Sequence, residues 1–306
     1  MITKDKVTEI FCIIDEFEKN LSVELSKNMH LPSSSNDGVR RRNRKGRMSK
    51  SEIMTILVCY HFGTYRNFKE YYLNCIRGQL KSYFPHAVSY NRFVELMPRV
   101  FYELMLFMCI YSFGRCSGIT FVDSTMIPVC HNLRRHINKV FAGLAKSGKG
   151  TMGWCHGFKL HFICNDSGEI ITFCLTAANV DDRDDIVWSV FTKHLYGKVF
   201  ADRGYIKQEL FESLFDRGIH LVHGLKANMK NKLMPMWDKI MLRKRYVIEC
   251  INHLLKEKAN LVHSRHRSVH NFIMNLCSAL AAYCFFEDKP QPLPVHRENT
   301  PQLELF

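Results

Sequence analysis

The sequence lacks an apolar run long enough to cross a membrane. Its longest such runs, at 104–113 and 276–286, fall short of the roughly 20 residues that a membrane helix needs. A secretory signal is absent as well, because acidic residues punctuate the helical pattern at the N-terminus. We therefore expect a cytoplasmic protein with no membrane partner.

Two zinc-binding patterns are also absent. The 12 cysteines form no C-x-x-C pair, and the 15 histidines show no H-E-x-x-H spacing. A zinc ribbon and a zinc hydrolase are therefore disfavoured. Many cysteines, such as Cys109 and Cys174, lie in apolar runs, where a reduced thiol behaves as a small buried hydrophobe. Trp154 and Trp188 are likewise assigned to the core.

Acidic residues are scarce relative to basic ones. Asp and Glu total 29 against 43 Lys and Arg, which gives a formal net charge of +14. Such a charge favours a polyanionic partner, most commonly a nucleic acid. A basic run at 40–47 is either a solvated arm or an arm that binds phosphate. We assign four of its arginines to DNA binding, namely Arg40, Arg41, Arg42 and Arg44.

The first 115 residues are predicted to form a helical N-terminal domain, since 306 residues are enough for two domains. Apolar residues recur at helical spacing within 5–29, and Ser49 with Glu52 has the form of a capping box. A turn-rich segment is predicted at 31–38, followed by a basic linker at 38–50. The domain is either a helix-turn-helix-like DNA reader or a plain helical bundle.

Residues 116–288 alternate between strand and helix patterns. The order predicts an α/β fold with a mixed sheet, which fits a ribonuclease-H-like catalytic core as well as other α/β folds. A loop is predicted at 134–153, and a flexible tail at 289–306. Strands are predicted at 118–123, 158–164, 169–175, 198–202 and 219–222, and helices at 184–195, 208–216, 241–260 and 268–286.

Two carboxylates end predicted strands. Asp123 follows Ile-Thr-Phe-Val, and Asp202 follows Lys-Val-Phe-Ala. Carboxylates at adjacent strand ends can converge, and they are hard oxygen ligands that suit Mg²⁺ or Mn²⁺. Two such ions can hold the attacking and leaving oxygens of a phosphodiester. Either acid alone is more simply explained as a turn or cap residue, so only the combination indicates a site.

A third carboxylate, Glu249, lies on the polar side of the helix predicted at 241–260. At about 100° per residue, Arg245, Asn252 and Lys256 share that side with it. The simpler interpretation is a solvated face with an Arg–Glu pair, which stabilises a helix by a few tenths of a kcal/mol. The alternative is a carboxylate placed between two cations at a catalytic site.

The spacing Arg245-x3-Glu249-x6-Lys256 resembles the Y-x2-R-x3-E-x6-K signature of insertion-sequence DDE transposases, although Leu242 stands where the signature has tyrosine. Over most of its length the chain resembles, more closely, the transposase family named after insertion sequence 982. The resemblance is specific because many segments carry it together. They are Tyr65-Arg-Asn-Phe-Lys, Val88-Ser-Tyr-Asn-Arg-Phe, Phe121-Val-Asp-Ser-Thr, Met152-Gly-Trp-Cys-His-Gly-Phe-Lys-Leu-His, Asn179-Val-Asp-Asp-Arg, Asp202-Arg-Gly-Tyr, Asn228-Met-Lys-Asn, Arg243-Lys-Arg-Tyr-Val-Ile-Glu and His263-Ser-Arg-His-Arg-Ser.

The resemblance implies that Asp123, Asp202 and Glu249 hold two Mg²⁺ or Mn²⁺ ions in a ribonuclease-H-like core. Water would free a 3′-hydroxyl at the end of the element, and that hydroxyl would attack target DNA. Arg245 and Lys256 would bind phosphates. The implied partners are double-stranded DNA, as terminal inverted repeats and target, and a second copy of the chain in a homodimer on DNA. The implied location is the bacterial cytoplasm, in association with the nucleoid.

Two alternatives stay open: a ribonuclease-H-like nuclease without strand transfer, and a catalytically silent DNA-binding relic. Further basic residues are assigned to DNA phosphate, namely Lys159, which shares a strand face with His161, and the pair Arg265 and Arg267. The acids at 181–185 are assigned to a helix start, where they complement the helix dipole.

Overall fold

The computed structural model describes residues 2–28, 46–63, 65–150, 153–224, 233–262 and 266–291. Within this part of the chain, no helix is both long and apolar enough to cross a membrane. The predicted tail lies outside it from 292 onwards. Five of the residues assigned to DNA binding also lie outside it, namely Arg40, Arg41, Arg42, Arg44 and Arg265.

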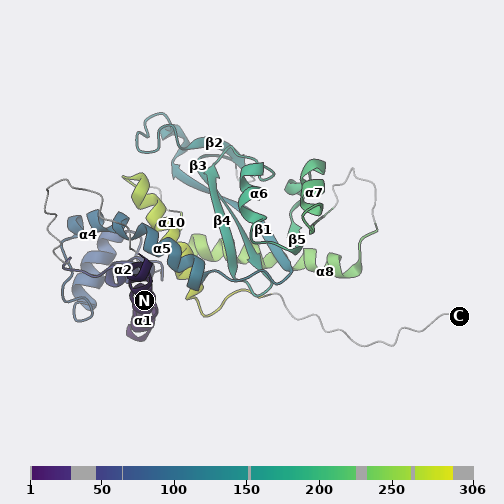
Figure 1. Ribbon diagram of the computed structural model, residues 1–306. Helices are drawn as coiled ribbons and strands as arrows, with labels where there is room; N and C mark the ends of the chain where they lie inside the picture. The colour runs from purple at the N-terminus through teal and green to yellow at the C-terminus, as the bar shows by residue number, and fades with distance from the viewer. Residues whose placement is uncertain are drawn as a thin grey trace, which may run out of the picture.

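Helices make up the regular structure of the described chain as far as Ser112 (Figure 1). The capping box predicted at the start of α2 is confirmed: Ser49 Oγ accepts a hydrogen bond from the N–H of Glu52, whose carboxylate accepts one from the N–H of Ser49. The helices are α1 (Lys4–Asn28), α2 (Lys50–Tyr60), α3 (Phe68–Glu70), α4 (Tyr90–Leu96) and α5 (Phe101–Phe107), with π-helical turns at Tyr71–Gln79 and Met108–Ser112 and a 3-10 turn at Met97–Val100.

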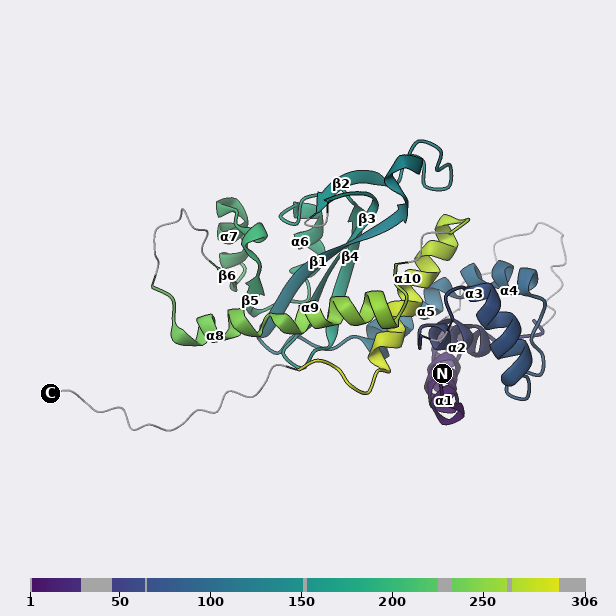
Figure 2. The ribbon, with the colours of Figure 1, turned by 180° about the vertical axis from the view of Figure 1, so that it is seen from behind.

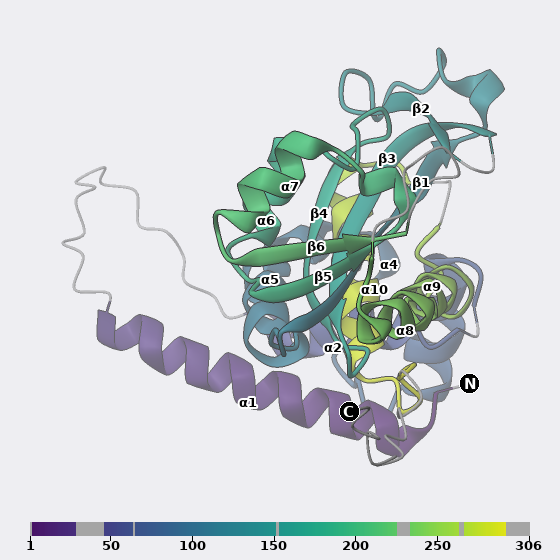
Figure 3. The same ribbon diagram turned by 90° about the vertical axis from the view of Figure 1, so that its right-hand side faces the viewer.

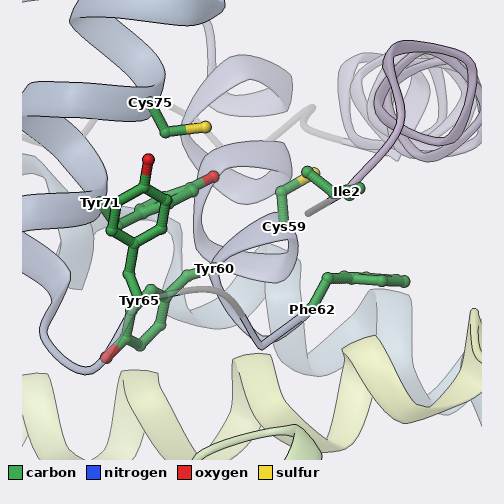
Figure 4. A pocket seen from close by; sticks show the side chains of 7 residues that line it. All are labelled: Ile2, Cys59, Tyr60, Phe62, Tyr65, Tyr71 and Cys75. Atoms are coloured by element: carbon green, nitrogen blue, oxygen red, sulfur yellow. The ribbon is translucent and has the colours of Figure 1, made fainter.

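Aromatic side chains hold these helices together. The rings of Tyr72 and Phe93, for example, have centroids 4.7 Å apart. Tyr71 donates a hydrogen bond from its hydroxyl to the carbonyl of Ile56, so its buried polar atom has a partner. Figure 4 shows a small hollow beside it, lined by Ile2, Cys59, Tyr60, Phe62, Tyr65, Tyr71 and Cys75. The lining is aromatic and apolar, which indicates core packing.

A six-stranded mixed sheet follows the helices. Its strands are β1 (Ile119–Cys130), β2 (Lys146–Gly150), β3 (Gly153–Asn165), β4 (Ile170–Ala177), β5 (Gly197–Ala201) and β6 (Ile219–His223), in the order β2-β3-β1-β5-β6 with β4 also paired to β3. The predicted hairpin is confirmed, because β3 and β4 are antiparallel neighbours. β1 is antiparallel to β3 and parallel to β5, which is parallel to β6.

Two expectations about this sheet are wrong. β1 does not end at Asp123 but continues to Cys130, because β3 remains hydrogen-bonded along it beyond that point. Residues 146–150 lie in the predicted loop, yet they form β2. Gly148 permits this edge strand to approach its neighbours, since a Cβ atom there would lie only 1.9 Å from the carbonyl oxygen of Ala178.

Helices cover both faces of the sheet (Figures 2 and 3). α6 (Asp185–Phe191) and α7 (Gln208–Phe215) lie on one face, and α8 (Met236–Lys244), α9 (Tyr246–His253) and α10 (Val269–Cys284) lie on the other, with a π-helical turn at Leu254–Lys258 after α9. Successive side chains of β1 pack into two different cores. Val122 packs towards α6, whereas Phe121 packs into a core shared with α9, α10 and the N-terminal helices.

The helix predicted at 241–260 is divided in the structure, because α8 and α9 are two helices that meet at Arg245.

The side chains assigned to the core from sequence divide into two groups. All 12 cysteines are free, and Trp188 is buried as predicted. Cys109 is exposed, however, and Cys174 is half-buried. Trp154 is 63% exposed, which contradicts its assignment to the core. It lies near the start of β3, beyond the stretch of that strand from Phe158 onwards that packs into the core.

Candidate active site

Asp123 lies in the middle of β1, just beyond the point where pairing with β5 ends. The last parallel pair sets Phe121 opposite Phe200, and extending this register by two residues brings Asp123 beside Asp202. Asp202 directly follows β5, as predicted, and its exposed carboxylate accepts a hydrogen bond of 2.6 Å from the N–H of Arg203. The strand order therefore sets two of the predicted carboxylates at one edge of the sheet.

α9 brings the third predicted carboxylate to the same strand. Arg245 Nη2 lies 2.6 Å from Glu249 Oε1, and its Nη1 lies 3.8 Å from Asp123 Oδ1. Asn252, one turn further along, donates a hydrogen bond of 2.8 Å from Nδ2 to Asp123 Oδ2. The side of the helix predicted to be polar thus faces β1, and one guanidinium joins Glu249 to Asp123.

Burial dominates the electrostatics of Asp123. It raises the pKa of this carboxyl to about 6, and the nearby carboxylates of Glu249 and Asp182 act in the same direction, while the Arg245 guanidinium opposes them. Asn252 Oδ1 is buried and accepts no hydrogen bond from any described residue. The site thus gathers negative charge and an unused oxygen where solvent is scarce, which favours a cation.

The donor set fits a hard divalent ion, because it consists of carboxylate and amide oxygens. Within the described residues, however, no three His, Cys, Asp or Glu side chains are grouped closely enough to hold a metal ion. Asp123 and Glu249 share the cation of Arg245 instead. The structure therefore shows two carboxylates brought together and a third, Asp202, at the adjacent strand end.

A further carboxylate, Asp182, lies close by, where β3 meets the segment after β4. Asp182 Oδ1 is 3.3 Å from Lys159 Nζ and 3.3 Å from His161 Nδ1. Lys159 also donates to the carbonyl of Val180 at 2.7 Å, and His161 Nε2 lies 2.8 Å from Thr176 Oγ1. The structure therefore places Lys159 in a buried ion pair and not on a surface that DNA phosphate would meet.

The place of Asp182 in this region was not predicted from the sequence, and Asn252 was predicted only to share the polar side of the helix with Glu249. The acids at 181–185 were assigned to the start of α6, and Asp184 does cap that helix by accepting a hydrogen bond of 2.9 Å from the N–H of Ile186. The available signal for Asp182 was the pair of polar residues that alternate along β3. A cation that a strand directs into the protein needs a carboxylate partner.

Two other basic residues assigned to phosphate binding, Lys256 and Arg267, lie within the described part of the chain. Lys256, in the π-helical turn after α9, is close enough to Cys155 of β3 that its charge counteracts the rise that burial causes in the pKa of that thiol. Arg267 is exposed just before α10. Lys256 thus extends the basic side of α9 away from Glu249 and towards the first residues of β3.

Replacing Asp182 with asparagine should lower the free energy of unfolding by about 2–4 kcal/mol, because Lys159 would keep its charge in a mostly buried place without a partner. Urea denaturation measures the change. Asp181→Asn is the matched control, since Asp181 pairs with Arg183 at the surface, where such a pair contributes about 0–1 kcal/mol. Equal losses for the two variants would contradict a buried ion pair at Asp182.

The chain is similar over 92% of its length to the piggyBac transposase in a synaptic complex with hairpin DNA, with 10% sequence identity, a TM-score of 0.42 and 73% of that chain covered. A search of curated proteins found no match. The family model described as the transposase DDE domain matches residues 113–269, more than half of the 306 residues, and this span contains Asp123, Asp202 and Glu249. The chain therefore belongs to the family of transposases with a DDE domain.

Proposed function

We propose that this protein is a DNA transposase that cleaves the ends of an insertion sequence and joins the freed 3′-hydroxyl to target DNA. The observation that carries the proposal is the approach of Glu249 to Asp123 across one arginine, within the segment that matches the DDE domain. The proposal includes a ribonuclease-H-like core at 116–288 and a DNA-binding helical domain at 1–115. Two DNA ends must be paired, so the active form is proposed to be a homodimer on DNA.

Asp123, Asp202 and Glu249 would hold the metal, with Mg²⁺ or Mn²⁺ as the ions and two ions expected. When bound, the ions supply Lewis-acid stabilisation of the phosphoryl group and lower the pKa of an attacking water. The residues present suit this role, since Asp123 is held in place by Asn252 and lies where negative charge gathers.

The cations of the chain have separate tasks. Arg245 counters the charge of Asp123 and Glu249, and its five N–H donors suit the non-bridging oxygens of a phosphodiester. Lys256, seven residues beyond Glu249, would bind a neighbouring phosphate of the same strand. Fixed charges aimed at the developing charge of the phosphoryl group stabilise the transition state.

A joining assay tests this proposal. The protein is incubated with Mg²⁺ or Mn²⁺, a target plasmid and DNA that carries the ends flanking its gene, with Asp123→Asn as the control variant. Joined products that disappear in the variant are expected. Cleavage without joining would instead indicate a ribonuclease-H-like nuclease, and metal-independent binding with no product would indicate a catalytically silent relic.

A further inference from the structure

The segment between β1 and β3, together with the adjoining parts of both strands, lacks acidic residues. No aspartate or glutamate occurs from 124 to 165, although 12% or so of an average stretch would be acidic at the ordinary share of charged residues. We call residues 131–150, together with Trp154, the basic arm. Its lysines and arginines are all exposed, namely Arg134, Arg135, Lys139, Lys146 and Lys149.

The basic arm also exposes large apolar side chains among these cations. Leu133 is 84% exposed, and Ile137, Leu144 and Trp154 are exposed as well. Trp154 pairs across the strands with Lys149, so an indole and an ammonium lie side by side on one face of the β2–β3 pair. Cations interleaved with apolar and aromatic surface suit a partner that offers phosphates together with sugars and bases.

The basic arm is fixed to the rest of the fold. Asn132 donates a hydrogen bond of 2.5 Å to the carbonyl of Trp154 and accepts one of 3.1 Å from the N–H of His156. Phe141, from the middle of the arm, is buried with its ring centroid 5.7 Å from that of Phe158 and 5.3 Å from that of Phe272 in α10. The arm is thus held in a defined position above β3 and α10 (Figure 2).

The basic arm lies at the same face of the sheet as the proposed catalytic residue Asp123. Phe162 is the cross-strand partner of Asp123, so the two side chains share a face of the sheet. Trp154 lies eight residues earlier on β3 and therefore on that face too. At about 3.3 Å per residue the separation is roughly 26 Å, the length of about eight base pairs at 3.4 Å each. Lys256 lies close to Cys155 of β3, the residue that follows Trp154.

We propose that the basic arm binds the DNA duplex about eight base pairs from the phosphodiester held at Asp123. Arg134, Arg135 and Lys149 hold backbone phosphates, and the ring of Trp154 packs against sugar and base edges. This inference rests on the proposed function, since it takes DNA as the substrate. The charge decides the partner, because an acid-free surface with five exposed cations repels a basic protein and attracts a polyanion.

The test measures DNA binding by fluorescence anisotropy in EDTA, at several salt concentrations, with a 30-base-pair duplex that carries the ends flanking the gene. Arg134→Ala/Arg135→Ala should reduce the slope of log K against log salt by about 2, at roughly 0.9 per phosphate contact. Trp154→Ala should weaken binding about tenfold, the effect of removing one large apolar side chain from an interface. Lys193→Ala/Arg217→Ala, on exposed residues of the α6–α7 layer, is the charge-matched control and should leave the slope near that of the parent.

Three outcomes are distinguishable. Loss of slope in the arm variant alone supports the inference. Equal slopes for the arm variant and the control, with a parent that binds DNA and joins it, would overturn the arm as a DNA-binding surface and leave the transposase proposal standing. A parent that binds no DNA at all would overturn both. Circular dichroism of each variant shows whether a loss of binding reflects a loss of folding, and Trp154→Phe, which keeps an aromatic ring, should bind more tightly than Trp154→Ala.

Discussion

Glu249→Gln protein should bind DNA as tightly as the parent and yet fail to cleave it, with a loss in rate of at least about 10²–10³-fold. Glutamine keeps the size of the side chain but removes its charge, so the carboxylate pair that faces Arg245 is lost. Fixed charges around a phosphoryl group contribute mainly in the transition state, which explains why the rate falls and binding does not. Cleavage of end-labelled DNA in Mn²⁺, together with an anisotropy titration in EDTA, separates the two effects.

Glu257→Gln is the matched control for this prediction. Glu257 is an exposed acid in the π-helical turn that continues α9, so its change removes the same charge from the same part of the chain. Cleavage by Glu257→Gln should equal that of the parent. If Glu249→Gln cleaves as fast as Glu257→Gln, then Glu249 takes no part in the reaction and its pairing with Arg245 only stabilises the helix.

Asp123→Asn should abolish cleavage and, in the absence of metal and DNA, make the protein more stable at pH 7. The Asp123 side chain is only 23% exposed, and burial raises the pKa of its carboxyl from 3.8 to about 6. At pH 7 the ionised acid therefore destabilises the folded state by on the order of 2–3 kcal/mol, and asparagine removes that cost while it can still accept a hydrogen bond from Asn252.

The pH dependence makes this prediction specific. Folding raises the pKa of Asp123, so the folded state favours the protonated acid, and the parent loses stability as pH rises from about 4 to about 6. Below pH 4 the acid is protonated in both folded and unfolded chains, and the parent and Asp123→Asn should be similarly stable. Urea denaturation in EDTA at pH 4 and pH 7 measures the difference. An Asp123→Asn protein that is less stable than the parent at pH 7 would show that Arg245 stabilises the charged form more than burial penalises it.

The polar side of α9 was predictable because helical periodicity is a local property. Apolar residues such as Ile248 and Ile251 fix the inward side, which leaves Arg245 and Glu249 on a shared polar side. The sequence does not state what that side faces, however. Its approach to Asp123 depends on the packing of a helix against a strand that lies more than 120 residues earlier in the chain.

The end of β1 was not predictable in the same way. The residues after Asp123 mix polar and apolar types, and strand length is set by the neighbour that continues to pair, which is β3 and not β5. β2 was missed because its residues, Lys146–Gly150, have low strand propensity, and β3 supplies its hydrogen bonds. The ion pair of Asp182 was hidden for a similar reason, since its partners come from a strand more than 20 residues away.

The exposure of Trp154 follows from the same dependence on tertiary structure. An apolar side chain is usually assigned to the core, and the surrounding sequence gives no reason to do otherwise. β3 is long enough to extend past its core, so its first residues carry their side chains into solvent. The basic arm was predicted as a loop, and only the structure joins it to the face of the sheet that holds Asp123.

Cleavage by Asp202→Asn is the measurement that tests the three-carboxylate centre most directly, because Asp202 is placed by strand register and not by a contact with Asp123. Asp216→Asn, at an exposed acid that follows α7, is the control. We predict that Asp202→Asn loses Mn²⁺-dependent cleavage as completely as Glu249→Gln, while Asp216→Asn retains it. Cleavage by Asp202→Asn at the rate of the parent would contradict a catalytic centre built from Asp123, Asp202 and Glu249.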